Sequence, residues 1–497
     1  MVKWGLPLMN AASAPPPIIR TAWFRAGLVV GGAGWLALVW SALCTVPGVP
    51  WNPARLSASF ALARGLPFYA LRDSGAHLGW FYGPVTPLWY LPVALTDNPT
   101  LALVLAGVIN LVTMLAPFAL VLAAAGVARG RALGGATLVA GVLLAGDHTH
   151  WAAYYFVHVD IVCLALGAAG CVALHRATVT GNARWLHAAA LGAVLAFWAK
   201  VLALPLFLAM PWWLWREGRG RLVRPLLFWF LVYGGAVSAG FFAWFGTEEI
   251  LFNVWLIHAR NPFYLWAQGD RLPGALVEHL GLAVAFAAVW IALAGWAWCD
   301  ARQDRDAPKL PERAGSLVRL LCWVALAELP LGMIAPLKSG GTLGSLHSVS
   351  WLFMAAMVWF WHRWSRPARG WGGGLTAGVF ALAMVVSAVR AQWDTREFPG
   401  EWKLYRGLEA DLAQARENQG KIYFPWNPML TIISERRVYP LDDALYCLAL
   451  AGLEPPPEKI RAAVPPGALM VYHENAQSHF AARYFVPPPA AANPPKP

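Results

Sequence analysis

Long apolar runs, separated by short polar and basic segments, fill most of the chain between residues 24 and 390. Several of these runs reach the roughly 20 residues that a helix needs to cross the hydrocarbon core of a bilayer. The pattern therefore predicts an all-α polytopic membrane protein. We predict about eleven transmembrane helices, at residues 24–44, 101–127, 133–146, 151–175, 185–199, 201–215, 225–246, 274–298, 317–336, 346–362 and 371–390.

The first loop of this transmembrane domain, residues 45–100, is interrupted repeatedly by proline and glycine. It contains an aromatic run at 80–95 that is too short and too rich in proline to cross a bilayer comfortably. We therefore expect this run to lie along the membrane interface.

The end of the chain has a different pattern. Leu404, Leu408 and Leu412 stand at helical spacing, and "LDDALYCLALAG" predicts another helix, with its aspartates suited to an N-cap. The segments "KIYFP" and "GALMVYH" predict short strands. We predict a small α/β domain at residues 391–485, followed by a disordered tail at 486–497. Residues 1–23 are predicted to form a cytoplasmic N-terminal arm.

Composition agrees with a membrane protein, and the distribution of charge predicts which loops lie on the cytoplasmic side. The chain is 58% hydrophobic and 13% charged, against about 25% charged in soluble domains. The net charge of +12 lies in residues 1–390, which have 27 Lys and Arg against 14 acidic residues. Loops on the predicted inner side hold 19 basic residues and those on the outer side seven. We therefore expect a membrane protein with a cytoplasmic N-terminus, an extracytoplasmic C-terminal domain and no nucleic-acid partner.

Ionisable groups gather on the predicted outer side. In "GDHTHWAAYYFVHVD", Asp147, His148 and His150 stand at the water boundary, whereas His158 and Asp160 fall inside the next helix. An ionised group within the hydrocarbon costs at least about 2.5 kcal/mol, so such groups tend to face a wet cavity or a charged partner. The first three residues are also metal-ligand types, but their spacing is not specific, and a divalent cation is left open.

Sugar transfer from a lipid-linked phosphate donor suits such a cavity. It needs a carboxylate to take the proton of the acceptor hydroxyl, and fixed cations to stabilise the departing phosphate. It also uses aromatic rings for stacking on the sugar, and "HLGWFYGPVTPLWYLP" supplies Trp80 and Tyr82.

Several short motifs occur in a fixed order along the chain. They are "ARLSASFALARGLPFYALRDSG", "YGPVTPLWYLP", "VHVDIVCLALG" around Asp160, "WAKVLALPLFL" around Lys200, and "KSGGTLGSLH" from Lys338 to His347. Their order and topology resemble the GT-C superfamily of integral-membrane glycosyltransferases. This class contains protein O-mannosyltransferases and lipid A aminoarabinose transferases, and the likeness is greatest to the branch with rhizobial lipopolysaccharide-core galacturonosyltransferases. The segment "YFPWNPMLTIISERRVYPLDDAL" resembles tails attached to such enzymes.

The resemblance implies a GT-C-like transmembrane domain at residues 24–390. It also implies an inverting transfer at the outer face of the bacterial cytoplasmic (inner) membrane. The implied partners are a polyprenyl-phosphate sugar donor and a lipid, glycan or protein acceptor. Family members usually carry a catalytic acid shortly after the first span, but "VPGVPWNPARLSASF" has Asn52 there. Asparagine is not a useful base. We therefore expect Asp160 and Asp73 to be catalytic, with Asp73 the nearest replacement for the missing acid.

The remaining site predictions concern substrate binding. Arg72, Lys200 and Lys338 are expected to hold the phosphate. Other candidates for substrate contact are His77, Trp80, Tyr82, Asp147, His158 and His347.

Plainer roles are open for these residues. Asp160 could simply pair with a cation on a neighbouring helix, Asp73 could form a turn, and Lys200 could reach headgroup phosphates. Glu328, within a predicted span, is expected to satisfy an internal cation.

Two other functions are also open: a transporter or flippase for a lipid-linked glycan, and a non-catalytic protein that binds one. A transporter would need charged groups at mid-membrane with partners on the inner face.

Overall fold

The computed structural model describes residues 22–127, 130–145, 153–263, 312–335, 338, 345, 347–364, 382, 384–387, 389, 406–471 and 480–485. Up to residue 364 the helices are α1 (Ala22–Thr45), η2 (Val46–Gly48), α2 (Trp51–Ala63), α3 (Val85–Trp89), η3 (Leu91–Leu95), α4 (Pro99–Ala124), α5 (Arg131–Ala145), α7 (Val159–Thr180), α8 (Arg184–Ala199), η4 (Val201–Ala203), α9 (Leu206–Arg216), η5 (Gly220–Leu222), α10 (Val223–Phe245), α11 (Thr247–Ile250), η6 (Leu251–Leu256), α12 (Ile257–Arg260), α16 (Glu312–Ile334) and α17 (His347–Trp364). The later elements are α19 (Leu408–Glu417), β1 (Ile422–Tyr423), α20 (Pro428–Glu435), α21 (Asp442–Leu450), α22 (Pro457–Ala462), β2 (Leu469–Met470) and α23 (Ala482–Phe485).

The helical architecture of a membrane protein is confirmed. Within the described ranges, five helices are long and apolar enough to cross a membrane, namely α1, α4, α7, α10 and α16. Four more predicted spans correspond to the shorter apolar helices α5, α8, α9 and α17. The span predicted at 274–298 lies outside the described residues, and most of 371–390 does too. The total of eleven spans therefore stays a prediction.

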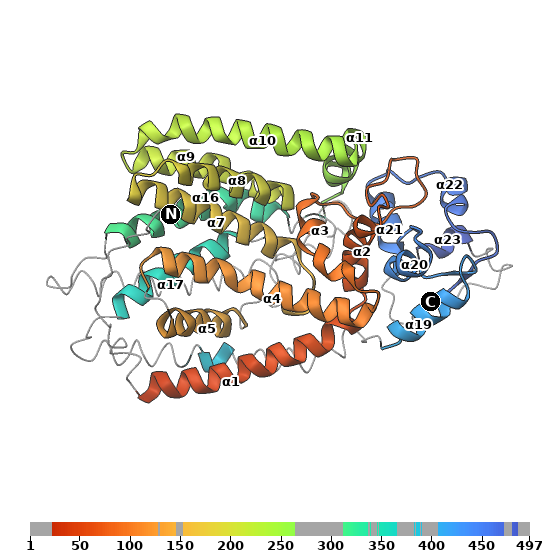
Figure 1. The fold of residues 1–497 in the computed structure, drawn as a ribbon, viewed down its shortest axis with the longest axis horizontal. Helices are drawn as coiled ribbons and strands as arrows, with labels where there is room; N and C mark the ends of the chain where they lie inside the picture. The colour runs from red at the N-terminus through yellow and green to blue at the C-terminus, as the bar shows by residue number, and fades with distance from the viewer. Residues whose placement is uncertain are drawn as a thin grey trace, which may run out of the picture.

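Helices α7 and α8 form a close pair at the centre of the bundle (Figure 1). A methyl group added at Gly192 would lie 2.9 Å from the Cα of Gly170. Small residues at such a point let two helix backbones approach closely, as is common in membrane bundles. This approach positions the ends of α7 and α8, where the ionisable groups lie.

One predicted helix begins in the wrong place. The span predicted at 151–175 corresponds to α7, which starts only at Val159. Residues 153–155 make a short helical turn, and His158 has extended backbone angles (φ −129°, ψ 132°). The apolar pattern runs through this break, so it could not reveal where the backbone leaves the helix.

The aromatic run of the first loop forms α3 and η3, which are five residues each and too short to cross a membrane. Before them, α2 carries the small and apolar residues of the first-loop motif, and nine of its residues are buried. Trp80 and Tyr90 are buried in the main hydrophobic core as well. The first loop is therefore an integral part of the packed structure.

The C-terminal region, defined here as residues 406–471 and 480–485, lies at one end of the bundle beside α2 and α3 (Figure 1). Strands β1 and β2 pair in parallel within the two predicted strand segments. These two-residue strands are the only strands in the described part of the region, so it is mainly helical. An α/β fold for the whole of 391–485 stays a prediction, and the arm at 1–21 and the tail at 486–497 lie outside the described residues.

Backbone contacts dock the C-terminal region on the first loop. The amide of Leu441 donates to the carbonyl of His77 at 2.8 Å. Leu441 and Ala444 also share a hydrophobic cluster with Ala54 of α2 and Phe81. At Gly75, an added Cβ would lie 2.0 Å from the carbonyl oxygen of Lys459. The two regions therefore meet without room for a side chain at Gly75.

We expect Gly75→Ala to loosen this contact. The added methyl must displace the backbone at Lys459, which should lower the free energy of unfolding by about 1–3 kcal/mol. Thermal melting in detergent measures the loss, and limited proteolysis shows whether the C-terminal region becomes accessible. Gly134→Ala is the control, because an added Cβ there meets nothing within 4 Å. Equal melting temperatures for the two variants would contradict the close docking.

Candidate functional site

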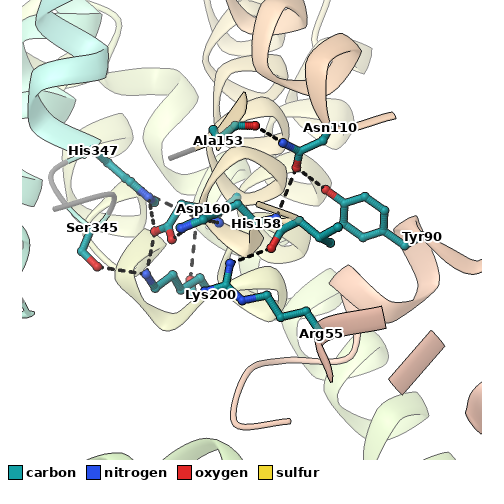
Figure 2. A network of polar contacts seen from close by, with 11 residues as sticks. Arg55, Tyr90, Asn110, Ala153, His158, Asp160, Lys200, Ser345 and His347 are labelled. Atoms are coloured by element: carbon teal, nitrogen blue, oxygen red, sulfur yellow. Dashed lines mark hydrogen bonds and ion pairs between the residues drawn. The ribbon is translucent and has the colours of Figure 1, made fainter. Parts of the chain in front are cut away.

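The centre of the site is the carboxylate of Asp160, in the first turn of α7 (Figure 2). Its Oδ1 lies 2.6 Å from Lys200 Nζ and 2.8 Å from His347 Nε2. Its Oδ2 lies 2.8 Å from His158 Nδ1. The exposed fractions of the Asp160 and Lys200 side chains are 7% and 12%, so this is a buried ion pair supported by two imidazoles. Four of the predicted site residues are thus brought together.

All four side chains project from helix ends. His158 is the N-cap of α7, Lys200 is the extended C-cap of α8, and His347 is the first residue of α17. Proline at position 205 precedes α9, and the short helix η4 fills the turn after Lys200. Because the chain stops being helical at these points, their side chains can reach across to one carboxylate.

The hydrogen-bond geometry fixes the proton positions on the two imidazoles. A carboxylate oxygen can only accept, so the 2.8 Å contacts make His158 Nδ1 and His347 Nε2 the donors. The Asp160 amide also approaches His158 Nδ1, at 3.4 Å, but this longer contact cannot be a hydrogen bond when Nδ1 carries the proton. Nδ1 of His347 then faces the thiol of Cys163, with Sγ 3.9 Å away. Nε2 of His158 is left as an acceptor, and it has no hydrogen-bond partner among the described residues. It is therefore free to accept a hydrogen bond from a ligand.

Asp160 itself is poorly suited to accept a proton. Its two oxygens already accept hydrogen bonds from an ammonium and two imidazoles, so it is well satisfied as an anion. Its geometry is that of a counter-ion that holds Lys200 and orients His158. The plainer role expected for Asp160, pairing with a cation on a neighbouring helix, is therefore observed with Lys200.

Tyr82 connects this centre to further predicted residues. Its ring lies 5.8 Å from Lys200 Nζ and 5.7 Å from the ring of His258. His258 Nε2 lies 2.7 Å from the carbonyl of Phe81, and the His258 carbonyl accepts a 2.7 Å hydrogen bond from Lys338 Nζ. Ser345 completes the shell, with Oγ 3.0 Å from Lys200 Nζ. Lys338 and Tyr82 therefore belong to one continuous network with Asp160.

The segment before α7 is held by side chains of α2. Asn52 donates through Nδ2 to the carbonyls of Val46, at 2.9 Å, and Tyr155, at 2.7 Å. Its Oδ1 accepts from the amide of Val157 at 2.9 Å. Arg55, one turn later, donates to the Val157 carbonyl at 2.8 Å. Both polar atoms of the fully buried Asn52 side chain are thus hydrogen-bonded to the backbone.

A second asparagine fixes the same segment from α4. Asn110 donates to the carbonyl of Ala153, while its Oδ1 accepts from the His158 amide at 3.2 Å and the Tyr90 hydroxyl at 2.7 Å. Buried peptide groups that have left the helix need such partners, because each unpaired group costs about 1–3 kcal/mol. Figure 2 shows these contacts beside the Asp160 centre.

Other predicted residues lie elsewhere. Arg72 and Asp73 are exposed on the turn at 71–74, and no contact described for the Asp160 network reaches them. The structure therefore does not bring Asp73 together with the Asp160 network, and its expected role as replacement for the missing acid stays a prediction. His77 and Trp80 are buried in the first loop instead, with the indole of Trp80 donating to the Gly83 carbonyl.

His77 faces the C-terminal region rather than the network. Its carbonyl accepts from Leu441, and burial lowers the pKa of its imidazole to about 4. Its Nε2 has no partner among the described residues. We therefore assign His77 to the docking of the two regions.

The metal candidates Asp147, His148 and His150 lie outside the described residues. Within the described ranges, no group of three or more His, Cys, Asp or Glu side chains has the arrangement of a metal site.

Glu328 lies within α16, and its expected cation is replaced by an indole. Trp351 donates through Nε1 to Glu328 Oε2 at 2.7 Å, and the side chain is buried. The prediction of an internal cation partner is therefore wrong in the described structure. Among the described residues, Glu328 has no cation partner. It therefore does not form part of a charged path across the bundle.

Several residues of the site were missed in the sequence, among them His258, Arg55, Ser345 and Asn110. Arg55 was counted only among the outer basic residues, and Ser345 carries no signal in its glycine-rich surroundings. Asn110 did carry one, because a buried amide in an apolar span requires a partner.

No protein-family model matches the chain, and a search of curated proteins finds no match to it. The resemblance to GT-C glycosyltransferases therefore stays a prediction, and function must be argued from the site.

We expect Asn52→Asp to destabilise the protein rather than to improve its chemistry. An ionised aspartate cannot donate to Val46 and Tyr155, and each lost partner should cost about 1–3 kcal/mol. Thermal melting in detergent tests this. The control is Asn418→Asp on the surface, which should change stability by about 0.5 kcal/mol or less. A stable Asn52→Asp variant would contradict the anchoring role.

The buried ion pair should behave as a unit. Asp160→Asn leaves the Lys200 ammonium without its counter-ion and should cost about 3–5 kcal/mol, whereas Asp160→Asn with Lys200→Met should recover part of that loss. For comparison, Asp97→Asn removes the Arg64 pair, whose carboxylate is 68% exposed, and should cost about 1 kcal/mol or less. Additive losses in the double variant would show that the pair is not coupled.

Proposed function

We propose that the protein is a membrane glycosyltransferase that moves a sugar from a polyprenyl-phosphate donor to a lipid, glycan or protein acceptor. The observation that carries this proposal is the meeting of Asp160, Lys200, His158 and His347 at the ends of three apolar helices, beside Tyr82. A buried polar site at the end of membrane helices suits a substrate with a lipid tail and a charged, sugar-bearing head.

The cations of the site supply the means to hold a phosphate. Lys200 is fixed by Asp160, and Arg55 is fixed by the Val157 carbonyl next to His158. Fixed cations stabilise negative charge that grows on a leaving phosphate without having to reorganise. Lys338, farther along the network, is the third candidate, and Ser345 adds a hydroxyl.

The neutral members of the network suit the sugar. Tyr82 offers a ring of the kind that stacks on sugar faces, and His158 Nε2 offers an acceptor for a hydroxyl. In this proposal Asp160 orients both Lys200 and His158, and it does not itself take the proton of the acceptor. The reaction then needs another base.

A flippase or a non-catalytic binder would use the same polar site without breaking a bond. The flippase is less well supported, because Glu328 is paired with Trp351 and not with an inner-face cation. Binding alone would not require the cation of Lys200 to be held in a fixed position by Asp160, as transfer does.

Deleting the gene in its host should separate these functions. Loss of a transferase removes the consumer of the donor, so one polyprenyl-phosphate sugar should accumulate, measured by mass spectrometry of the lipid extract. Complementation with the wild-type chain should restore its level, and Lys200→Met should not. Loss of a flippase would instead trap the lipid on the inner leaflet, where an impermeant oxidant cannot reach its sugar. Unchanged lipid-linked sugars in the deletion strain would contradict the proposal.

A further inference from the structure

The C-terminal region has an acidic residue whose carboxyl lies within electrostatic range of Arg55, namely Asp443 in the first turn of α21. Its neighbour Ala444 packs in one hydrophobic cluster with Ala54 of α2 and Phe81. A Cβ added at Gly79 would lie 3.1 Å from the Cβ of Ala444, so this end of α21 is tightly seated on the first loop. The residue that follows Ala54 is Arg55.

The charge of Arg55 acts both on Asp443 and on His158 of the site. Its guanidinium donates to the carbonyl of Val157, directly before His158, and lies 5.5 Å from the ring centre of Phe156. Figure 2 draws Arg55 beside His158. The charge of Arg55 also acts on the carboxyl of Asp443, without forming an ion pair of 4 Å or less in the described structure.

The two adjacent aspartates of α21 have different surroundings. Asp442 is buried, and its Oδ1 accepts a 2.6 Å hydrogen bond from the amide of Ala481, so it has a structural use. Asp443 is only partly buried, and its carboxyl has no hydrogen bond or ion pair with any described residue. Its carboxyl therefore keeps both oxygens without a partner among the described residues.

The protonation of Asp443 also suits acid–base work. Burial raises the pKa of its carboxyl to about 7, Arg55 lowers that pKa, and Asp442 raises it. Asp443 in turn acts on the thiol of Cys447, on the next turn of α21, and raises its pKa further. A carboxylate that titrates near neutral pH is an effective general base.

We propose that Asp443 is the base of the transferase, a catalytic residue contributed by the C-terminal region. This inference rests on the proposed function. The acceptor oxygen forms a bond to the anomeric carbon of the sugar while the bond from that carbon to the phosphate oxygen breaks. The phosphate leaves with the electron pair, held by Arg55 and Lys200. The hydroxyl proton passes to the Asp443 carboxylate and from there to water.

The assay uses membranes that contain the full-length chain and the polyprenyl-phosphate sugar that accumulates in the deletion strain, isotopically labelled, with wild-type envelope as acceptor. Asp443→Asn should lower kcat by about 100-fold or more, with the KM for the donor unchanged. Glu458→Gln is the matched control, because Glu458 is an exposed acid in the same region and should retain activity.

The pH profile adds a signature that a structural role would not produce. Wild-type kcat should rise with pH through about 7, as the Asp443 carboxyl ionises. Asp443→Glu should keep a rising profile, and the residual rate of Asp443→Asn should be flat over this range.

Stability is the second readout. Because the folded pKa lies above the usual value of about 3.9, ionisation opposes folding, so wild-type stability should fall as pH rises from about 4 to 7. Asp443→Asn should lose this decline and melt no lower than wild type at pH 8.

Several outcomes would overturn the inference. An Asp443→Asn enzyme with full activity would do so, as would one that fails to accumulate in the membrane, because the structure gives this carboxyl no structural bond. Loss of activity in His158→Gln with full activity in Asp443→Asn would assign the base to His158. Wild-type membranes without any transfer would contradict the proposed function itself, and the role of Asp443 with it.

Discussion

The arrangement of the site depends on compensating one buried carboxylate. An isolated ion in an apolar interior costs several kcal/mol, and that cost is offset only when a partner of opposite charge and enough hydrogen bonds are present. Asp160 meets both needs with Lys200 and two histidines. Because these partners stand at the ends of α8, α7 and α17, satisfying one carboxylate brings three helix ends together. The same contacts that stabilise the charge also define the geometry of the polar centre.

The second requirement is backbone that leaves the helix inside an apolar environment. Between residues 153 and 158 the peptide groups lose helical partners, and these residues are buried away from water. Asn52 and Asn110 replace the missing bonds, and Arg55 takes a further carbonyl. An asparagine can donate and accept at once, which a carboxylate cannot. This explains physically why an acid at position 52 would be incompatible with the observed packing.

Helix α2 connects the membrane bundle with the C-terminal region. Asn52 and Arg55 reach the segment before α7, and Ala54 packs against α21. A movement of the C-terminal region would therefore be transmitted to the site through α2. Packing that excludes a side chain at Gly75 makes this connection stiff. The proposed role of Asp443 follows from that connection, since a carboxyl on a loosely attached region could not be positioned.

Local properties of the sequence determined the class of the protein: apolar runs of sufficient length make membrane helices, and rare ionisable residues near their ends need partners. These rules were enough to single out Asp160, Lys200, His158 and His347, which the structure brings together. They could not tell that Asp73 is exposed, that Glu328 meets Trp351, or that Asn52 is an anchor. Those outcomes depend on contacts between residues that lie far apart in the chain. Only helix packing decides such contacts, because the same polar side chain is satisfied equally well by any suitable partner that the fold brings near.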